Sequence, residues 1–203
     1  MPDAPLILAF DTSAAHCAAA LLSGDRIIES AREEMAKGQA ERLMGLCAEL
    51  LNAAGAAYGD LSAIGVGIGP GNFTGIRISV AAARGLALGL GRPAVGVSAF
   101  EALRYGHEGP CVCAVDARRG QLFVQGFGNP HLAEPALLDE GNLPPFDGPL
   151  IGATGQAPAH GVAEATARVA ATRYRDAPPR PAPLYLRPAD AAPARDTAPA
   201  LLS

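Results

Sequence analysis

The feature that most restricts how this chain can fold is a strand pattern that occurs twice. Residues 6–10 form a continuous apolar run that ends at Asp11, and a polar turn then leads into a second apolar run. Residues 111–115 show the same arrangement, with Asp116 at the end, a short polar turn and a second apolar run. Short apolar runs bounded by turn residues are typical of buried strands. The chain is therefore expected to contain two related α/β lobes, each opening with antiparallel strands.

The first lobe is predicted to be larger than the second. Residues 16–22 and 26–34 extend the opening strand into a three-stranded meander, whereas residues 128–149 are rich in proline, glycine and acidic side chains and should be mostly loop. Further strands are expected at 63–68, 94–97 and 121–127, and helices at 39–54, 74–90, 99–105 and 160–174. The predicted divisions are a first lobe at 1–106, a smaller second lobe at 107–188 and a flexible Pro/Ala-rich tail at 189–203.

The charge and the cysteines exclude several classes of protein. The formal net charge is -4, and the arginines are spread along the chain without the basic patch of an independent nucleic-acid binder. Cys111 and Cys113 would share one face of a strand, but no second Cys or His pair stands at ligand spacing. Buried thiols in a reducing compartment are therefore expected, and no metal site is predicted.

No segment is predicted to enter a membrane. The N-terminal residues lack the pattern of a secretory signal. The most apolar window, residues 76–90, is interrupted by Arg77 and Arg84. A cytoplasmic location is expected.

A glycine-rich loop at residues 69–75 joins an apolar strand to a long helix. Its glycines would let the backbone approach a neighbour closely, and the start of the following helix can attract an anion. The Gly-Lys-Ser/Thr ending of a Walker loop is absent. Two interpretations stay open: a turn that holds a nucleotide phosphate or a partner, and a tight structural connection.

Two polar turns accompany this loop. Asp11 and the two hydroxyl residues after it could orient a hydrated metal ion or a phosphate, or could form an Asx-type turn. The turn after Asp116 carries arginine, which suits a phosphate or a partner carboxylate. The candidate phosphate-binding residues are Asp11, Thr12, Ser13, Gly69, Gly71, Asn72, Thr74, Gly75 and Arg118.

No catalytic residue is predicted. The sequence has no His-Glu-x-x-His string and no Gly-x-Ser-x-Gly string, and its four histidines are isolated. A zinc protease and a serine hydrolase of the nucleophile-elbow type are therefore disfavoured.

Four strings of residues resemble the TsaB family, the bacterial dimerisation subunits of the tRNA threonylcarbamoyladenosine (t6A) machinery. They are Leu-Ala-Phe-Asp-Thr-Ser at 8–13, Gly-Pro-Gly-Asn-Phe-Thr-Gly-Ile-Arg at 69–77, Val-Asp-Ala-Arg-Arg-Gly at 115–120 and Pro-Leu-Tyr-Leu-Arg at 183–187. Their order and spacing extend the resemblance over almost the whole chain. The resemblance implies the actin-like ATPase (ASKHA) fold, with two lobes that each open with a β-meander and a shortened second lobe.

The resemblance also implies a function. Members of the family pair with a catalytic paralogue, TsaD, and the pair recruits an ATPase, TsaE, to transfer a threonylcarbamoyl group to the adenosine beside the anticodon of tRNAs that read codons beginning with A. This chain would be the non-catalytic scaffold, would meet tRNA through the complex, and would form a homodimer when alone. ATP or ADP at the complex interface is the candidate cofactor. Nothing in the sequence supports the older naming as a glycoprotease.

The predicted contact surface combines two helices. The helix at 74–90 is apolar nearly all round, which favours a partner interface, and the resemblance adds the helix at 39–54. The predicted interface residues are Leu43, Met44, Cys47, Ala48, Leu51, Ile76, Ser79, Ala82, Ala83 and Leu86, with Gly45 and Gly85 allowing close approach. The family often has histidine where this chain has Gln39, so no base is expected there. The alternative function is a stand-alone actin-type ATPase or small-molecule kinase that uses Asp11, the glycine loop and Asp116.

Overall fold

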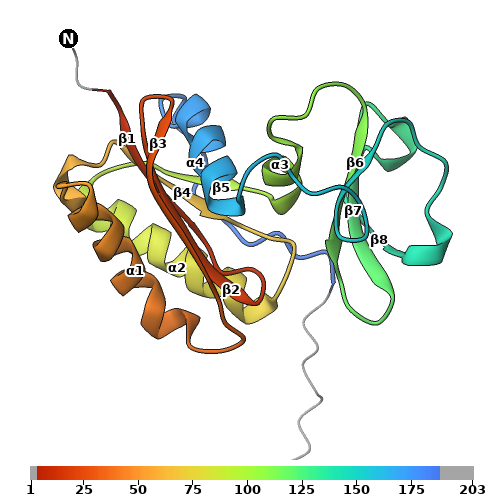
Figure 1. Ribbon diagram of the computed structural model, residues 1–203, viewed down its shortest axis with the longest axis horizontal. Coiled ribbons are helices and arrows are strands. Elements are labelled where there is room, and N and C mark those ends of the chain that lie inside the picture. Colours follow the sequence, from red (N-terminus) through yellow and green to blue (C-terminus); the bar gives the residue numbers. More distant parts are fainter. Residues whose placement is uncertain (1–3, 188–203) are drawn as a thin grey trace, which may run out of the picture.

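The structure, a computed structural model, describes residues 4–187 and contains two β-sheets that lie side by side (Figure 1). The first sheet has five strands in the order β3-β2-β1-β4-β5. Their bounds are β1 (Leu6–Asp11), β2 (His16–Ser23), β3 (Arg26–Glu34), β4 (Ala63–Gly67) and β5 (Ala94–Val97). Because β1 and β4 are parallel, their carboxyl ends share one edge, which places Asp11 next to the glycine loop that follows β4.

The second sheet repeats the connectivity of the first. Its order is β8-β7-β6-β9, which matches β3-β2-β1-β4, and β6 pairs antiparallel with β7 and parallel with β9. The strands are β6 (Cys111–Asp116), β7 (Gln121–Phe127), β8 (Ala136–Asp139) and β9 (Leu150–Gly152). The strand repeat expected from the sequence is therefore present, and the mixed α/β fold class is confirmed.

Helices cover both faces of the first sheet (Figure 1). On one face lie α1 (Gln39–Ala53) and α2 (Phe73–Leu90), and on the other lies α4 (Val162–Arg173), while α3 (Ala99–Arg104) stands between the two sheets. Short 3₁₀ turns occur at Tyr58–Asp60, Pro130–Leu132 and Glu140–Asn142.

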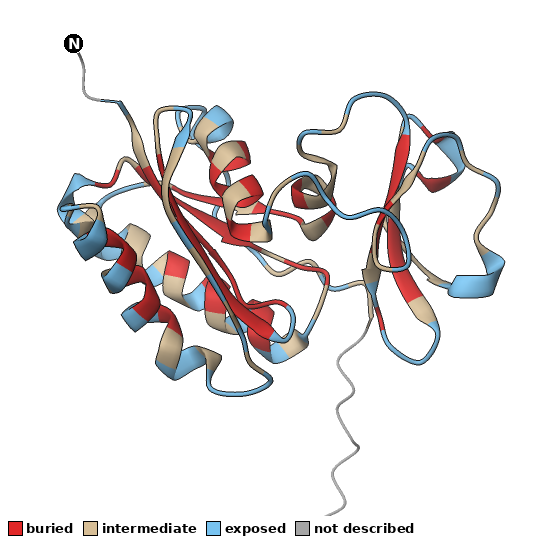
Figure 2. Cartoon of the chain, viewed as in Figure 1, coloured by how far each residue is buried: buried red, intermediate tan, exposed pale blue. Residues whose placement is uncertain are grey.

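The strand period of two divides the apolar side chains of β1 between these layers. Leu8 and Phe10 are fully buried under α1 and α2, whereas Ile7 and Ala9 are fully buried against α4. Buried residues accordingly follow the sheet and the inner helix faces, and the outer faces of α1 and α2 contain exposed positions (Figure 2). The core of the first lobe thus lies on both sides of one sheet.

Two parts of the chain show features that the sequence-based expectation lacks. The region at 128–149 is mostly loop, as expected, but residues 136–139 form strand β8, which pairs antiparallel with β7. Helix α4 falls inside the predicted second lobe at 107–188 but packs on β1, β2 and β4 of the first sheet. The division into separate domains stays a prediction, and the predicted tail at 189–203 lies outside the described residues.

Within residues 4–187, α2 is the one helix that by length and composition alone could cross a membrane. Its mean hydropathy over 18 residues is 1.3. In this fold α2 packs on β4, and its two arginines, Arg77 and Arg84, hydrogen-bond to Tyr185 and to the Pro181 carbonyl. These are the contacts of a helix that forms one layer of an α/β lobe.

Candidate functional site

The glycine loop is seated directly on the polar turn after β1. The amide of Asn72 donates to the Ser13 carbonyl over 2.6 Å, and the Thr12 hydroxyl donates to the Gly75 carbonyl over 2.7 Å. A Cβ at Gly71 would overlap the Ser13 carbonyl, and one at Gly75 would overlap the Thr12 carbonyl. These glycines are therefore required so that two backbone segments of the chain itself can touch.

The start of α2 is closed by a residue of the same loop. Asn72 is the N-cap, and its side-chain oxygen accepts a 2.9 Å hydrogen bond from the Gly75 amide. With the Asn72 amide held by Ser13, two of the donors that a bound phosphate would need are already occupied. This arrangement favours the structural interpretation of the loop over the phosphate cradle.

Asp11 is 1% exposed and hydrogen-bonded within its own turn. One of its oxygens, Oδ1, accepts from the amide and the hydroxyl of Ser13, each over 2.8 Å, and lies 2.8 Å from His16 Nε2. The described residues contain no cluster of three or more His, Cys, Asp or Glu side chains that could hold a metal ion. The hydrogen bonds of the carboxylate organise the turn after β1.

His16 looks isolated in the sequence, yet the structure pairs it with Asp11. A signal for this pairing exists in the hairpin register: Asp11 ends β1 and His16 begins β2 after four intervening residues. In the structure His16 is 5% exposed, and its Nδ1 has no hydrogen-bond partner among the described residues.

The second lobe has a turn of the same construction but a different environment. The Arg118 amide donates to Asp116 Oδ1 over 2.7 Å, as the Ser13 amide does to Asp11 in the first lobe. Asp116 is exposed, and Arg118 and Arg119 both adopt left-handed backbone angles, with φ of 62° and 57°. The guanidinium of Arg118 forms no hydrogen bond or ion pair with the described residues, and it lines the cleft described below.

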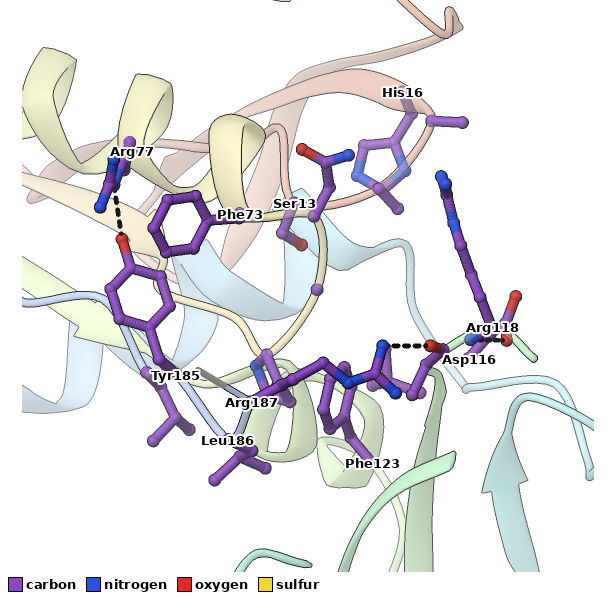
Figure 3. Close-up of a pocket in the computed structure, with 18 of the residues that line it drawn as sticks. Ser13, His16, Phe73, Arg77, Asp116, Arg118, Phe123, Tyr185, Leu186 and Arg187 are labelled. Carbon is purple, nitrogen blue, oxygen red and sulfur yellow. Dashed lines mark hydrogen bonds between the residues drawn. The ribbon is translucent and has the colours of Figure 1, made fainter. Parts of the chain in front are cut away.

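A cleft of about 940 Å³ lies between the two lobes (Figure 3). The first lobe contributes Ser13, His16 and Phe73, and the second contributes Asp116 and Arg118. The lining residues from the C-terminal part of the described chain are Leu184, Tyr185, Leu186 and Arg187. Of the predicted phosphate-binding residues, Ser13, Gly71, Asn72 and Arg118 line this cleft, whereas Asp11, Thr12, Gly69, Thr74 and Gly75 do not.

In the sequence, residues 184–187 are notable only because they belong to a motif shared with the TsaB family. That motif does not predict where these residues lie in the structure. Tyr185 packs on Phe73, with ring centroids 4.7 Å apart, and Arg187 donates to the Ala117 carbonyl in the turn between β6 and β7. These contacts join residues more than 60 positions apart, so no local pattern could reveal them.

The predicted partner interface stays a prediction, but six of its ten side chains are buried within this chain. The buried side chains, which belong to the core of this chain, are Leu43, Cys47, Leu51, Ile76, Ser79 and Ala83. The accessible or partly accessible ones are Met44, Ala48, Ala82 and Leu86. Helical spacing identifies a stripe, but it cannot tell which stripe of an apolar helix faces the sheet.

The outer stripe of α2 instead combines three small residues with two large ones, Arg77 and Leu88. Arg77, Ala81, Gly85, Leu88 and Gly89 are exposed, and Leu88 is 85% exposed. A Cβ at Gly85 or Gly89 would meet nothing within 4 Å. These five positions make up the outer face of α2.

The fold is similar to the folds of solved structures, among them two from Pseudomonas aeruginosa. The structure aligns with an uncharacterized protein with similarity to peptidase YeaZ from Pseudomonas aeruginosa (TM-score 0.73, 25% identity, 90% of this chain and 100% of that chain). It also aligns with YeaZ from P. aeruginosa (TM-score 0.60, 32% identity, 71% of this chain and 72% of that chain). Both agree with a two-sheet α/β protein of the actin-like ATPase type.

The sequence comparisons give the family. The family model "TsaD: tRNA N6-adenosine threonylcarbamoyltransferase" matches residues 27–132. The tRNA threonylcarbamoyladenosine biosynthesis protein TsaB of Escherichia coli is 34% identical over 122 residues, which cover 58% of this chain and 52% of that protein. An uncharacterized protein of Mycobacterium bovis is 31% identical over 206 residues, covering 92% of this chain and 94% of that protein. The chain matches about half the length of the E. coli and Bacillus subtilis TsaB proteins.

The fold and the closed turn after β1 thus define the class: a two-lobed, actin-like α/β protein. The chain belongs to the TsaD family, and within that family it is TsaB/YeaZ-like.

Proposed function

We propose that this chain is a non-catalytic scaffold subunit that binds a TsaD-like catalytic paralogue through the outer faces of α1 and α2. Bound in this way, it would hold the paralogue in the arrangement that transfers threonylcarbamoyl to the adenosine beside the anticodon of tRNA. The observation that carries the proposal is the part of the outer face of α2 formed by Gly85, Leu88 and Gly89, which are exposed and whose identity the packing of the described residues does not require.

Glycine at exposed helical positions is unfavourable for an isolated chain. Each glycine in a helix interior costs about 0.5–1 kcal/mol relative to alanine. Gly85 and Gly89 touch nothing that a Cβ would displace, so neither is required by the chain's own packing. A helix from another protein could approach closely there, and the exposed Leu88 would lose its contact with water.

The helix next to α2 offers a second part of the same surface. Met44 on α1 is 39% exposed, and α1 packs beside α2 on the same face of the sheet. Arg42 fixes α1 by hydrogen bonds to Glu33 on β3 and to Glu49, with N–O distances of 2.6–2.8 Å. The two helices are thus held in place before any partner arrives, which lowers the cost of binding.

The closed polar turn supports a non-catalytic role. Asp11, Thr12 and Ser13 are buried and hydrogen-bonded to one another or to the loop above them. The chemistry of transfer would then belong to the paralogue, and contacts with a TsaE-like ATPase and with tRNA would be made in the assembled complex. The candidate site for ATP or ADP is the interface of that complex.

The test is a binding measurement with a matched pair of substitutions. Gly85→Leu places a bulky side chain on the outer face of α2, and it should abolish co-purification with the paralogue. Gly85→Ala adds one methyl group, and Gly59→Leu adds the same bulk at an exposed glycine outside both helices. Both controls should retain the heterodimer, and a Gly85→Leu chain that still binds the paralogue normally would contradict the proposal.

A stand-alone ATPase or small-molecule kinase is the second candidate function, and it is favoured by the Arg118 guanidinium, which lines the interlobe cleft and has no partner among residues 4–187. Calorimetry of the isolated chain with ATP and magnesium separates the two candidates. Tight binding of ATP with turnover would support the enzymatic function. Absence of ATP binding, together with binding of the paralogue, would support the scaffold function. Light scattering of the free chain tests the homodimer that the same helix faces would form.

A further inference from the structure

We propose that residues 184–187 form a latch that fixes the two lobes relative to each other and thereby sets the start of α2 for partner docking. Tyr185 and Arg187 are the positioning residues of this latch. The docking part of the inference rests on the proposed function, whereas the interlobe part stands on the geometry of this chain alone.

Tyr185 attaches the latch to the first turn of α2 (Figure 3). Its hydroxyl accepts a 2.9 Å hydrogen bond from Arg77 Nε, and its ring lies 4.7 Å from the ring of Phe73. The guanidinium carbon of Arg77 lies 3.7 Å from the Phe73 ring centroid, so the three side chains form one cluster. Phe73 and Arg77 are both α2 residues, and Phe73 is the first residue of the helix.

Arg187 attaches the latch to the second lobe. Its guanidinium donates to the Ala117 carbonyl over 3.2 Å and to Gln121 Oε1 over 2.5 Å. Both acceptors border the turn between β6 and β7. A guanidinium that donates to two acceptors fixes the orientation of the arginine side chain relative to them as well as its distance.

The main chain between these two side chains also spans the lobes. The Leu184 amide donates to the Ile68 carbonyl over 2.8 Å, just before the glycine loop. The side chains of Leu184 and Leu186 pack instead with the second-lobe core, which includes Phe123. The latch therefore holds the first lobe through its backbone and Tyr185, and the second lobe through its leucines and Arg187.

A second attachment is needed because the other packing between the sheets is concentrated at one element. Helix α3 contacts β6 and β9 of the second sheet and α4 of the first lobe. One packed element between two lobes acts as a hinge about which they can rotate. The latch lines the cleft, which α3 does not, so it removes this rotation and transmits the position of the β6–β7 turn to the first turn of α2.

The latch connects the lobes only while both of its ends are attached, Tyr185 to the first lobe and Arg187 to the second. Loss of either attachment should therefore release the lobes. Tyr185→Ala and Arg187→Ala should increase interlobe motion by similar amounts, and the double variant should show no further increase. Independent stabilising contacts would instead give additive effects. Tyr185→Phe keeps the ring on Phe73 and removes only the hydroxyl, and it should show a smaller change in the same direction.

The experiment measures the distance between the lobes in the full-length chain. Spin labels are attached at Asn52→Cys and Glu140→Cys, which are exposed on the first and second lobes, while the native cysteines are buried. Each latch variant should broaden the distance distribution, and Arg180→Ala, an exposed arginine without hydrogen bonds in the described structure, should not. An unchanged distribution in both single variants, or additive broadening in the double variant, overturns the latch.

Affinity for the paralogue is then measured with the same variants. Each single variant should weaken binding about five- to tenfold, because the first turn of α2 loses its connection to the second lobe. Gly85→Leu should abolish binding without changing the interlobe distance. Released lobes with unchanged affinity would overturn the positioning role. If the unmodified chain fails to bind the paralogue, the proposed function fails, and the distance measurement still decides the latch.

Discussion

His16 Nε2 lies 2.8 Å from Asp11 Oδ1, and both side chains are almost entirely buried. The carboxylate that ends β1 is thus held inside the first lobe by a histidine from the next strand and by Ser13. Its counterpart Asp116 occupies the matching position of the second sheet but is exposed. The internal repeat therefore places one aspartate in a structural role and leaves the other open to the cleft.

The first prediction uses this pair of aspartates. Asp11→Ala should destabilise the fold by about 3 kcal/mol, because it leaves the buried donors of Ser13 and His16 without an acceptor. Asp116→Ala is the matched control and should change the free energy of unfolding by less than about 1 kcal/mol. Urea denaturation measures both. Equal stability of the two variants would contradict the structural role of Asp11.

The second prediction concerns two glycines of α2. Gly75→Ala should destabilise by about 2–4 kcal/mol, because its Cβ would overlap the Thr12 carbonyl. Gly85→Ala should stabilise the isolated chain by about 0.5–1 kcal/mol, because nothing surrounds that position and alanine favours a helix. Thermal unfolding of the two variants compares them directly, and shifts of the same sign would contradict the packing described for the glycine loop.

The third prediction is a pH dependence that originates at Glu101. Burial raises the pKa of this carboxyl, but hydrogen bonds from Ser98 and from Arg173 outweigh burial and hold the pKa below the ordinary value of 4.5. Because the folded pKa is the lower one, the stabilisation is fully present above the unfolded pKa and is lost as pH falls through the folded value. Glu101→Gln should therefore cost most at neutral pH and progressively less in acid.

Urea denaturation at neutral and at acid pH measures this dependence. Glu108→Gln, at an exposed carboxyl without hydrogen bonds in the described structure, is the control and should show no such trend. If the loss of unfolding free energy caused by Glu101→Gln increased as the pH fell, the prediction would be contradicted.

The fourth prediction concerns the cysteines. All four are buried and unpaired with one another, and burial raises the pKa of Cys17 to about 11 and of Cys47 to about 12. Thiolate is the reactive form, so a thiol reagent at neutral pH should label none of them in the native chain and all of them after unfolding. Rapid labelling of Cys111 or Cys113 in the native state would indicate that the second sheet opens.

Local pattern predicts much of this fold but little of its site. The apolar runs before Asp11 and Asp116 identify β1 and β6 because burial and strand length are local properties. The role of Gly71 and Gly75 stays open in the sequence, because what a glycine touches depends on a segment about 60 residues away. The contacts of Tyr185 and Arg187 are beyond local pattern for the same reason.

Helix α2 shows a different limit of prediction from sequence. Ile76 and Ser79 are expected at a partner surface, but they lie buried in the core of the first lobe. A helix that is apolar on most of its circumference offers several stripes of equal hydrophobicity, and only the position of the sheet selects the buried one.

The position of α4 has a consequence for the order in which the chain acquires its structure. The helix lies tight on the first sheet, where a Cβ at Gly65 would come within 3.0 Å of the Ala170 Cβ. Ile7 and Ala9 need this cover, yet α4 leaves the ribosome after both sheets have been synthesised. The nascent first lobe must therefore wait, with one apolar face open to water or to a chaperone, until residue 173 has emerged.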